Sequence, residues 1–292
     1  MRHAALIRAL AIAACSLCLI VVVLGAYVRL SDAGLGCPDW PGCYGHLTPH
    51  SDTAAIDLGR AWREMLHRYA AGTLGLMIAC LAGMTLAWRL ELIAPLGLGV
   101  GRLGIVILQA IFGMLTVTWR RKPLIVTLHL LFGLTTLSLL WWLVLTLTGQ
   151  PSAAARPGAA RTLALLGLVV LGLQIALGGW TSSNYAAIAC PDLPTCQGSW
   201  WPPANFGPAA IHMTHRYGAL AASLALLAAA IASAPRRWAL AVLALLCLQL
   251  TIGVSMVLRG FPLWLATAHN AGAALLLLAT LALNRSLRPD PP

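Results

Sequence analysis

The chain has 292 residues, of which 60% are hydrophobic and only 9% are charged. A soluble domain usually carries about 25% charged residues, so this composition excludes an ordinary soluble enzyme and indicates an integral membrane protein. The net charge of +11 does not indicate nucleic-acid binding, because the basic residues are scattered near the ends of apolar runs, where they act as topology signals and interface anchors.

Eight apolar runs are long enough to cross a membrane as helices, each of which needs about 20 residues. The runs are continuous and rich in Leu and Ala, which favours helices over the alternating strands of a barrel. The first run also resembles a signal peptide, but its length and its continuation to Val28 favour an uncleaved helix. In chain order the expected spans are 7–28, 66–88, 96–118, 124–147, 162–182, 210–232, 238–258 and 264–284.

A polar segment rich in Pro, Gly and Ala, residues 149–161, divides the eight runs into two sets of four. We therefore expect an N-terminal half at 1–148, a linker at 149–161 and a C-terminal half at 162–292. The expected fold is an all-α integral membrane protein whose eight transmembrane helices form two pseudo-symmetric four-helix bundles.

Repeated motifs support this division. In each half a Gln-x3-Gly sequence stands twenty residues before a Thr-x-His sequence. The glutamines are Gln109 and Gln249, and the histidines that follow them are His129 and His269. The repeats have the same orientation in the membrane, because each half contains four spans.

A second repeat is a Cys-Pro-Asp-x-Pro-x-Cys loop, found at Cys37–Cys43 and at Cys190–Cys196. Both copies fall on the side of the membrane opposite the termini. Disulfides persist in the periplasm, and two cysteines flanking a proline-containing turn can approach to bridging distance. We expect two disulfides in periplasmic loops and cytoplasmic termini. Free thiols or a four-thiolate metal site are the alternatives, and the basic turn at 120–122 is a contrary topology signal.

Four histidines lie within spans at matched depth, towards the side of the cysteine loops. Ionisable groups inside a bilayer are costly and mark functional sites. Two imidazoles on different helices of one four-helix unit can face each other across its core and ligate a haem iron. The alternative is a hydrogen bond from each histidine to a neighbouring helix. These histidines are His67, His129, His215 and His269.

Glu64 breaks the repeat. It lies three residues before His67, one helical turn away on the same face, whereas His212 occupies that place before His215. A carboxylate beside a haem can move protons or stabilise a developing cation. We therefore expect the N-terminal half to perform chemistry and the C-terminal half to assist. The alternative for Glu64 is a surface carboxylate paired with a neighbouring arginine.

An arginine follows one histidine in each half, at Arg68 and Arg216. Each is a candidate partner for haem propionates, since arginine binds carboxylates well. The alternative is that each side chain extends towards the membrane interface.

Together these motifs resemble the haem A synthases, specifically the cysteine-bearing bacterial type, over almost the whole chain. In the N-terminal half the matching residues are Gly25-Ala-Tyr-Val-Arg-Leu, Gly34-Leu-Gly-Cys37-Pro-Asp-Trp-Pro, Glu64-x2-His67-Arg68 and Thr127-x-His129. In the C-terminal half they are Ser183-Asn-Tyr, Cys190-Pro-Asp-Leu-Pro-Thr-Cys196-Gln-Gly-Ser-Trp-Trp-Pro, His215-Arg216 and His269.

The resemblance implies an oxidoreductase acting on a CH group, which oxidises a methyl group of haem O to a formyl group and so supplies haem A for terminal oxidase biogenesis. It implies that Glu64 is catalytic and that His67 and His129 bind the substrate haem. It further implies that His215 and His269 ligate the iron of a haem b cofactor. The implied location is the bacterial cytoplasmic (inner) membrane.

The expected partners follow from the same reasoning. They are the substrate haem O, membrane lipid and, as candidates, a haem O synthase, terminal oxidase assembly factors and a second copy of the chain. No nucleic acid is expected, and the motifs identify no electron donor or acceptor. The alternative functions are a two-haem b-type membrane electron-transfer cytochrome and, less well supported, a transporter with duplicated halves.

Overall fold

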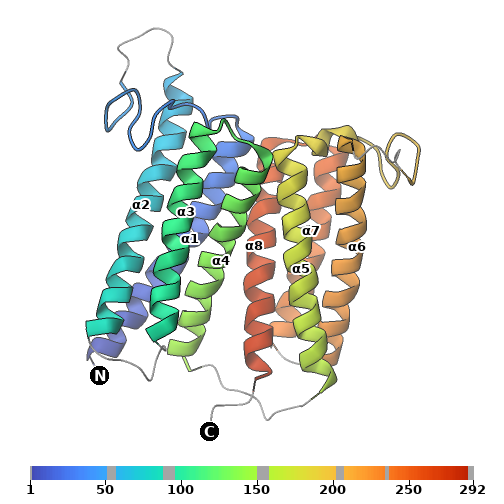
Figure 1. Ribbon diagram of the computed structural model, residues 1–292. Helices are drawn as coiled ribbons and strands as arrows, with labels where there is room; N and C mark the ends of the chain where they lie inside the picture. The colour runs from blue at the N-terminus through green and yellow to red at the C-terminus, as the bar shows by residue number, and fades with distance from the viewer. Residues whose placement is uncertain are drawn as a thin grey trace. The chain divides into compact units, whose positions relative to one another are not determined.

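The computed structural model describes residues 2–50, 57–87, 96–149, 158–201, 207–233 and 237–288, and these ranges are helical apart from their loops (Figure 1). Within them lie eight α-helices and one short 3-10 helix, so the all-α prediction is confirmed. The helices are α1 (Arg2–Leu30), α2 (Leu58–Ala87), α3 (Leu96–Thr118), α4 (Pro123–Leu147), α5 (Ala159–Ser183), η1 (Ala186–Ala189), α6 (Pro208–Ser233), α7 (Arg237–Leu258) and α8 (Leu263–Ser286).

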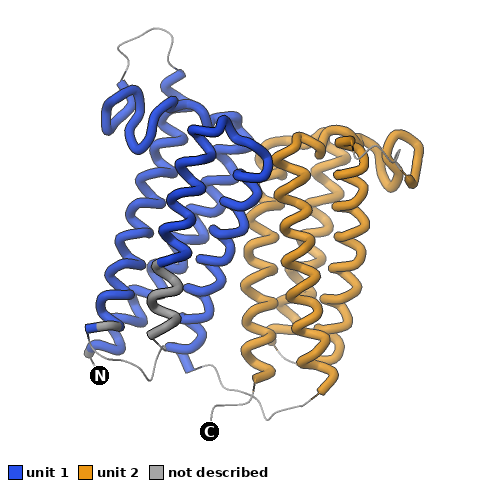
Figure 2. Tube along the Cα trace, in the orientation of Figure 1, with its two compact units in different colours: residues 1–149 blue, residues 150–292 orange. Residues whose placement is uncertain are grey.

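The chain divides into two compact units, Met1–Gly149 and Gln150–Pro292 (Figure 2). In the first unit, α1 and α3 each pack against α2 and α4. In the second unit, α5 and α7 each pack against α6 and α8. Within each unit the four helices therefore form a closed ring of packing contacts. Most of the expected linker, 150–157, lies outside the described residues.

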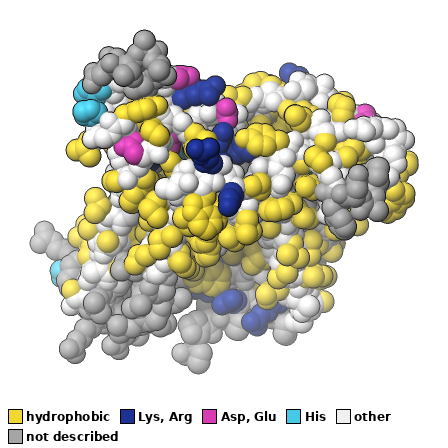
Figure 3. Space-filling model, turned by 45° about the horizontal axis from the view of Figure 1, so that its top comes forward, with side chains coloured by type: hydrophobic (Ala, Val, Ile, Leu, Met, Phe, Trp, Pro, Cys, Tyr) yellow, Lys and Arg dark blue, Asp and Glu magenta, His cyan; other side chains and the backbone are white. Residues whose placement is uncertain are grey.

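Among the described residues, seven helices are long and apolar enough to cross a membrane, which makes this a multi-pass membrane protein. The eighth expected span, 96–118, coincides with α3, of which Gly104–Thr118 is a shorter apolar helix, so its crossing of the membrane stays a prediction. Large apolar side chains are exposed on the helix flanks, for example Leu76 at 71% and Leu173 at 62%. Broad areas of hydrophobic side chains on one face are visible in Figure 3. Such surfaces suit contact with lipid rather than water.

Helix α2 begins at Leu58, eight residues before the start predicted from hydropathy. The side chain of Asp57 accepts a hydrogen bond from the backbone N–H of Arg60 at 3.0 Å, as an N-terminal capping residue does. The first two turns carry polar residues, including Arg63 and Glu64, so hydropathy alone misses them. The consequence is that Glu64 and His67 belong to one continuous helix.

Both cysteine loops are closed by the predicted disulfides. Cys37 and Cys43 are joined with a Cα–Cα distance of 4.8 Å, and Cys190 and Cys196 with a distance of 4.7 Å. Each bridge is buried against the helix that follows its loop, on Met65 of α2 in the first unit and on a methionine of α6 in the second. The bridges therefore tie the loops to the helices that carry His67 and His215.

In each loop an aspartate side chain accepts hydrogen bonds from backbone N–H groups of the same loop. Asp192 accepts hydrogen bonds from the backbone N–H groups of Gln197 at 2.7 Å and Gly198 at 3.2 Å, and from the hydroxyl of Thr195 at 2.8 Å. These bonds, led by that from Gln197, lower the pKa of Asp192 to about 2. Asp39 makes the same pair of backbone bonds in the first loop, at 2.6 and 2.8 Å.

Asp32 connects three segments at the loop end of the first unit. It pairs with Arg121 in the turn between α3 and α4 at 2.5 Å and with Arg60 of α2 at 3.5 Å. The hydrogen bond from Arg121 is the main cause that lowers the pKa of Asp32. Ion pairs therefore link the 120–122 turn and the start of α2 to the segment that follows α1.

Candidate functional site

The two histidines of the first unit lie against glycines on the neighbouring helices. A Cβ atom added to Gly25 of α1 would lie only 2.8 Å from Cε1 of His67, and one added to Gly113 of α3 would lie 3.2 Å from Cε1 of His129. Only glycine leaves full room for either ring.

The second unit repeats this arrangement. A Cβ atom at Gly178 of α5 would lie 3.0 Å from Cε1 of His215, and one at Gly253 of α7 would lie 3.0 Å from Cε1 of His269. Each unit thus carries its two predicted histidines in equivalent positions, against a glycine of a neighbouring helix. Their pairing about one ligand stays a prediction.

The histidine pairs fit a haem iron. The Nδ1 atoms of His67, His129 and His269 are buried and have no hydrogen-bond partner among the described residues. A buried polar atom without a partner costs about 1–3 kcal/mol, so each ring is suited to a ligand that supplies one. A haem macrocycle occupies four positions on its iron and leaves two axial positions for such side chains. The described residues contain no cluster of three or more His, Cys, Asp or Glu, so paired axial ligation fits better than a metal cluster.

Two glutamines contact the histidines of the second unit. The Nε2 atom of Gln174 lies 3.0 Å from Nδ1 of His215 and donates to the backbone carbonyl of the same residue at 3.0 Å. The Nε2 atom of Gln249 lies 3.3 Å from Nε2 of His269 and donates to its carbonyl at 3.0 Å. The sequence repeat does not reveal Gln174. It stands 41 residues before its histidine, whereas the two repeated glutamines stand twenty residues before theirs.

Glu64 is buried, with only 4% of its surface exposed. One carboxylate oxygen accepts the backbone N–H of Cys37 at 3.0 Å, and the other pairs with Arg68 at 2.6 Å. Glu64 is therefore enclosed between the first cysteine loop and its own helix, and is not an exposed surface carboxylate. In the second unit His212 is also buried, and its Nε2 atom accepts a hydrogen bond of 3.4 Å from Nε of Arg216 in place of an ion pair.

Arg68 holds the first loop in place. Its Nη1 atom donates to the backbone carbonyls of Asp39 at 2.8 Å and Gly42 at 2.6 Å. Arg216 does the same in the second loop, donating to the carbonyls of Thr195 at 2.6 Å and Cys190 at 2.9 Å. Both guanidinium groups thus already bind loop carbonyls, and their pairing with haem propionates stays a prediction.

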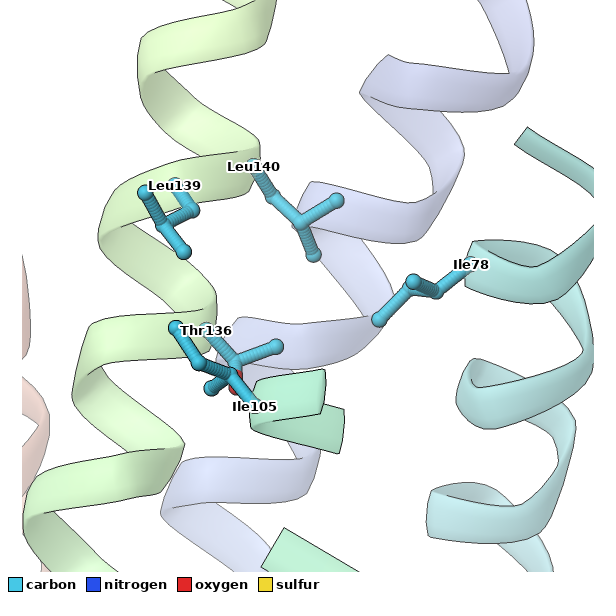
Figure 4. Close-up of a pocket in the computed structure, with 5 residues that line it drawn as sticks. All are labelled: Ile78, Ile105, Thr136, Leu139 and Leu140. Atoms are coloured by element: carbon cyan, nitrogen blue, oxygen red, sulfur yellow. The ribbon is translucent and has the colours of Figure 1, made fainter. Parts of the chain in front are cut away.

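A small apolar crevice with about 10 Å³ of free space lies between α2, α3 and α4 of the first unit. Side chains from these helices point into it in Figure 4. Its one hydroxyl, on Thr136, donates to a backbone carbonyl of its own helix at 2.9 Å. Thr136 is seven residues beyond His129, or about 10 Å along the helix. A space of this size holds about one water molecule. Its lining residues are Ile78, Ile105, Thr136, Leu139 and Leu140.

Apolar helices long enough to span a membrane, with two partly buried histidines in each unit, define a multi-pass membrane protein. The sequence profile of the COX15-CtaA family, described as a cytochrome oxidase assembly protein, matches residues 8–281. The chain belongs to this family, that of the haem A synthases.

Relatives that match almost the full chain agree with this assignment. A haem A synthase from Shewanella oneidensis is 40% identical over 91% of this chain and 92% of its own length. One from Rhizorhabdus wittichii is 29% identical over 89% of this chain and 88% of its own. A third, from Bacillus licheniformis, is 28% identical over 86% of each.

Proposed function

We propose that the protein converts haem O to haem A by oxidising a ring methyl group to a formyl group. Written as a half-reaction, R–CH3 and H2O give R–CHO, four protons and four electrons. The family supports this activity. Within the chain, the observation that carries the proposal is the buried carboxylate of Glu64, which has His212 in its place in the second unit.

The first unit is the proposed substrate site. His67 and His129 would hold the iron of haem O, and their glycine neighbours leave room for both rings. Haem O carries a farnesyl tail, which is apolar. Part of that tail is proposed to pack against the apolar side chains around Thr136, which would have to move apart to admit it.

The second unit is the proposed site of a resident haem b, with His215 and His269 as its iron ligands. Bound haem supplies redox chemistry, while the protein orients it and sets its electrostatic surroundings. Among the described residues, the uncharged side chains of two glutamines contact these histidines, and two glycines lie against their rings. This surrounding suits electron transfer or support better than proton transfer.

Glu64 is the proposed catalytic group. Four protons leave the substrate carbon and water during the oxidation, and a buried carboxylate one turn from His67 can accept and release a proton in turn. Its bond to Arg68 and to the N–H of Cys37 would fix its position. The disulfide-closed loop above it would limit the entry of water.

The proposed orientation places both cysteine loops in the periplasm and both termini in the cytoplasm. Its support is the disulfide in each loop, because such bonds persist in an oxidising compartment. The two units are proposed to be pseudo-symmetric bundles. This rests on their matching loops and glycine–histidine contacts.

The test is expression of the full chain in a bacterial host that makes haem O but no haem A, followed by extraction of the pigments. The proposal expects haem A to appear. Folded, haem-loaded protein without haem A would contradict it and would favour the alternative, a two-haem electron-transfer cytochrome, for which the Glu64 asymmetry has no use.

A further inference from the structure

Three of the four helix pairs that carry a histidine also carry a glutamine on the facing helix. In each pair the glutamine lies one turn before the glycine that faces the ring, as Gln174 precedes Gly178 and Gln249 precedes Gly253. In the first unit Gln109 precedes Gly113 in the same way, and its amide lies against α4 at Gly133, one turn beyond His129.

A second glycine, on the helix of the histidine, leaves space for each glutamine side chain. A Cβ atom added to Gly218 or to Gly272 would overlap the Oε1 atom of the facing glutamine, and one added to Gly133 would lie 3.0 Å from Nε2 of Gln109. These glycines stand three or four residues after their histidines. The glutamine and the second glycine therefore form one structural arrangement.

The fourth pair, α1 with α2, lacks both members of this arrangement. Val21 stands four residues before Gly25, where a glutamine would be expected, and Ala70 stands three residues after His67, where the second glycine would be. The side chain of valine forms no hydrogen bonds. Because this pair has no glutamine, the methyl group of Ala70 does not occupy space that a glutamine side chain would need. His67 is thus the one histidine of the four with no glutamine beside it.

We propose that Gln109, Gln174 and Gln249 are positioning residues for iron-ligating histidines, and that the missing fourth glutamine makes His67 the exchangeable ligand of the substrate site. The inference rests on the proposed function. A ligating imidazole carries a proton on its other nitrogen and needs an acceptor for it. The Oε1 atoms of all three glutamines are buried without a partner in the described structure. A half-turn of the amide would present Oε1 to the ring proton, in exchange for the bond that Nε2 of Gln174 and Gln249 now donates to the backbone carbonyl of the histidine.

The distribution of the glutamines matches the two roles. In the second unit, where a cofactor must stay bound, both histidines contact a glutamine. In the first unit, where a substrate must enter and a product must leave, only the α3–α4 pair has one. A ring without this partner is held less firmly in its ligating orientation, so it releases iron more readily.

The first experiment removes a glutamine from the purified, haem-loaded full chain. Gln249→Leu is expected to speed the transfer of haem b to apomyoglobin by about 10-fold or more, since partners of ligand histidines affect metal affinity by about 10–100-fold. It is also expected to change the reduction potential and the low-spin electron paramagnetic resonance signal. Gln249→Glu, which keeps an acceptor, should restore haem retention. The matched control is Gln197→Leu, in the second cysteine loop.

The converse experiment installs the missing arrangement. Val21→Gln combined with Ala70→Gly is expected to slow haem release from the first unit by about 10-fold, with Ala70→Gly alone as control. Unchanged release in this variant, or an unchanged potential and retention in Gln249→Leu, would overturn the inference. Haem b serves as the probe throughout, so these rates stay measurable even if the wild-type protein fails to form haem A, which would refute the proposed function separately.

Discussion

The first cysteine loop is expected to depend on Arg68 more than on any exposed arginine near it. Arg68 and Glu64 form an ion pair at 2.6 Å, with only 12% and 5% of their side chains exposed. The same guanidinium donates to two loop carbonyls. Arg68→Gln removes the positive charge, so the buried carboxylate of Glu64 loses its ion-pair partner.

The size of the effect follows from this burial. Removing one partner of a buried ion pair costs about 3–5 kcal/mol, because the remaining charge is left uncompensated. Arg60 is the matched control. It pairs with Asp32 at 3.5 Å, with 47% and 55% of the side chains exposed, and exposed pairs contribute about 0–1 kcal/mol.

The assay is thermal unfolding of the detergent-solubilised protein, together with the rate at which a mild reductant opens the Cys37–Cys43 bond. Arg68→Gln is expected to lower the unfolding midpoint clearly and to speed reduction, whereas Arg60→Gln should change both little. Equal effects of the two substitutions would refute the claim that the buried Arg68–Glu64 pair holds the loop.

Two further predictions concern the second unit. Gly178→Ala places a methyl group 3.0 Å from the His215 ring and is expected to lower the haem b content of the purified protein, whereas Gly172→Ala, on the same helix with open space around it, should leave the content unchanged. The pKa of Asp192 is lowered to about 2, chiefly by the N–H of Gln197, from a usual value of about 3.9. Because the folded-state value is the lower one, the carboxylate stabilises the loop above about pH 4, and this contribution is lost as the pH falls towards about 2. Fluorescence of the loop tryptophans should report that loss, and Asp192→Asn should abolish its pH dependence. An unaltered pH profile in the asparagine variant would contradict this account. Equal haem b content in the two glycine variants would contradict the account of Gly178.

Hydropathy predicts the helices well because spanning segments are long and almost purely apolar. It fails at α2, where Arg60, Arg63 and Glu64 make the first turns polar although they are helical. The signal for the true start was present in Asp57, whose side chain caps the helix. A search for capping residues would have found it.

The disulfides were predictable from compartment and spacing, and the pairing of the histidines stays a prediction. The contacts of Arg68 and Arg216 with loop carbonyls were not predictable, because such bonds join residues 21 to 29 positions apart. The pairing of Asp32 with Arg121, across 89 positions, was equally beyond the sequence. Side chains that bridge loops and helices follow from tertiary packing, which a repeat or hydropathy pattern does not encode.

The central claim is a division of labour, with conversion in the first unit and a resident haem b in the second. It is tested most directly by extracting pigments from purified Glu64→Gln protein made in a host that supplies haem O. The account predicts haem b at the wild-type stoichiometry and no haem A or a stalled intermediate. Loss of haem b in this variant, or haem A formed at the wild-type level, would contradict it.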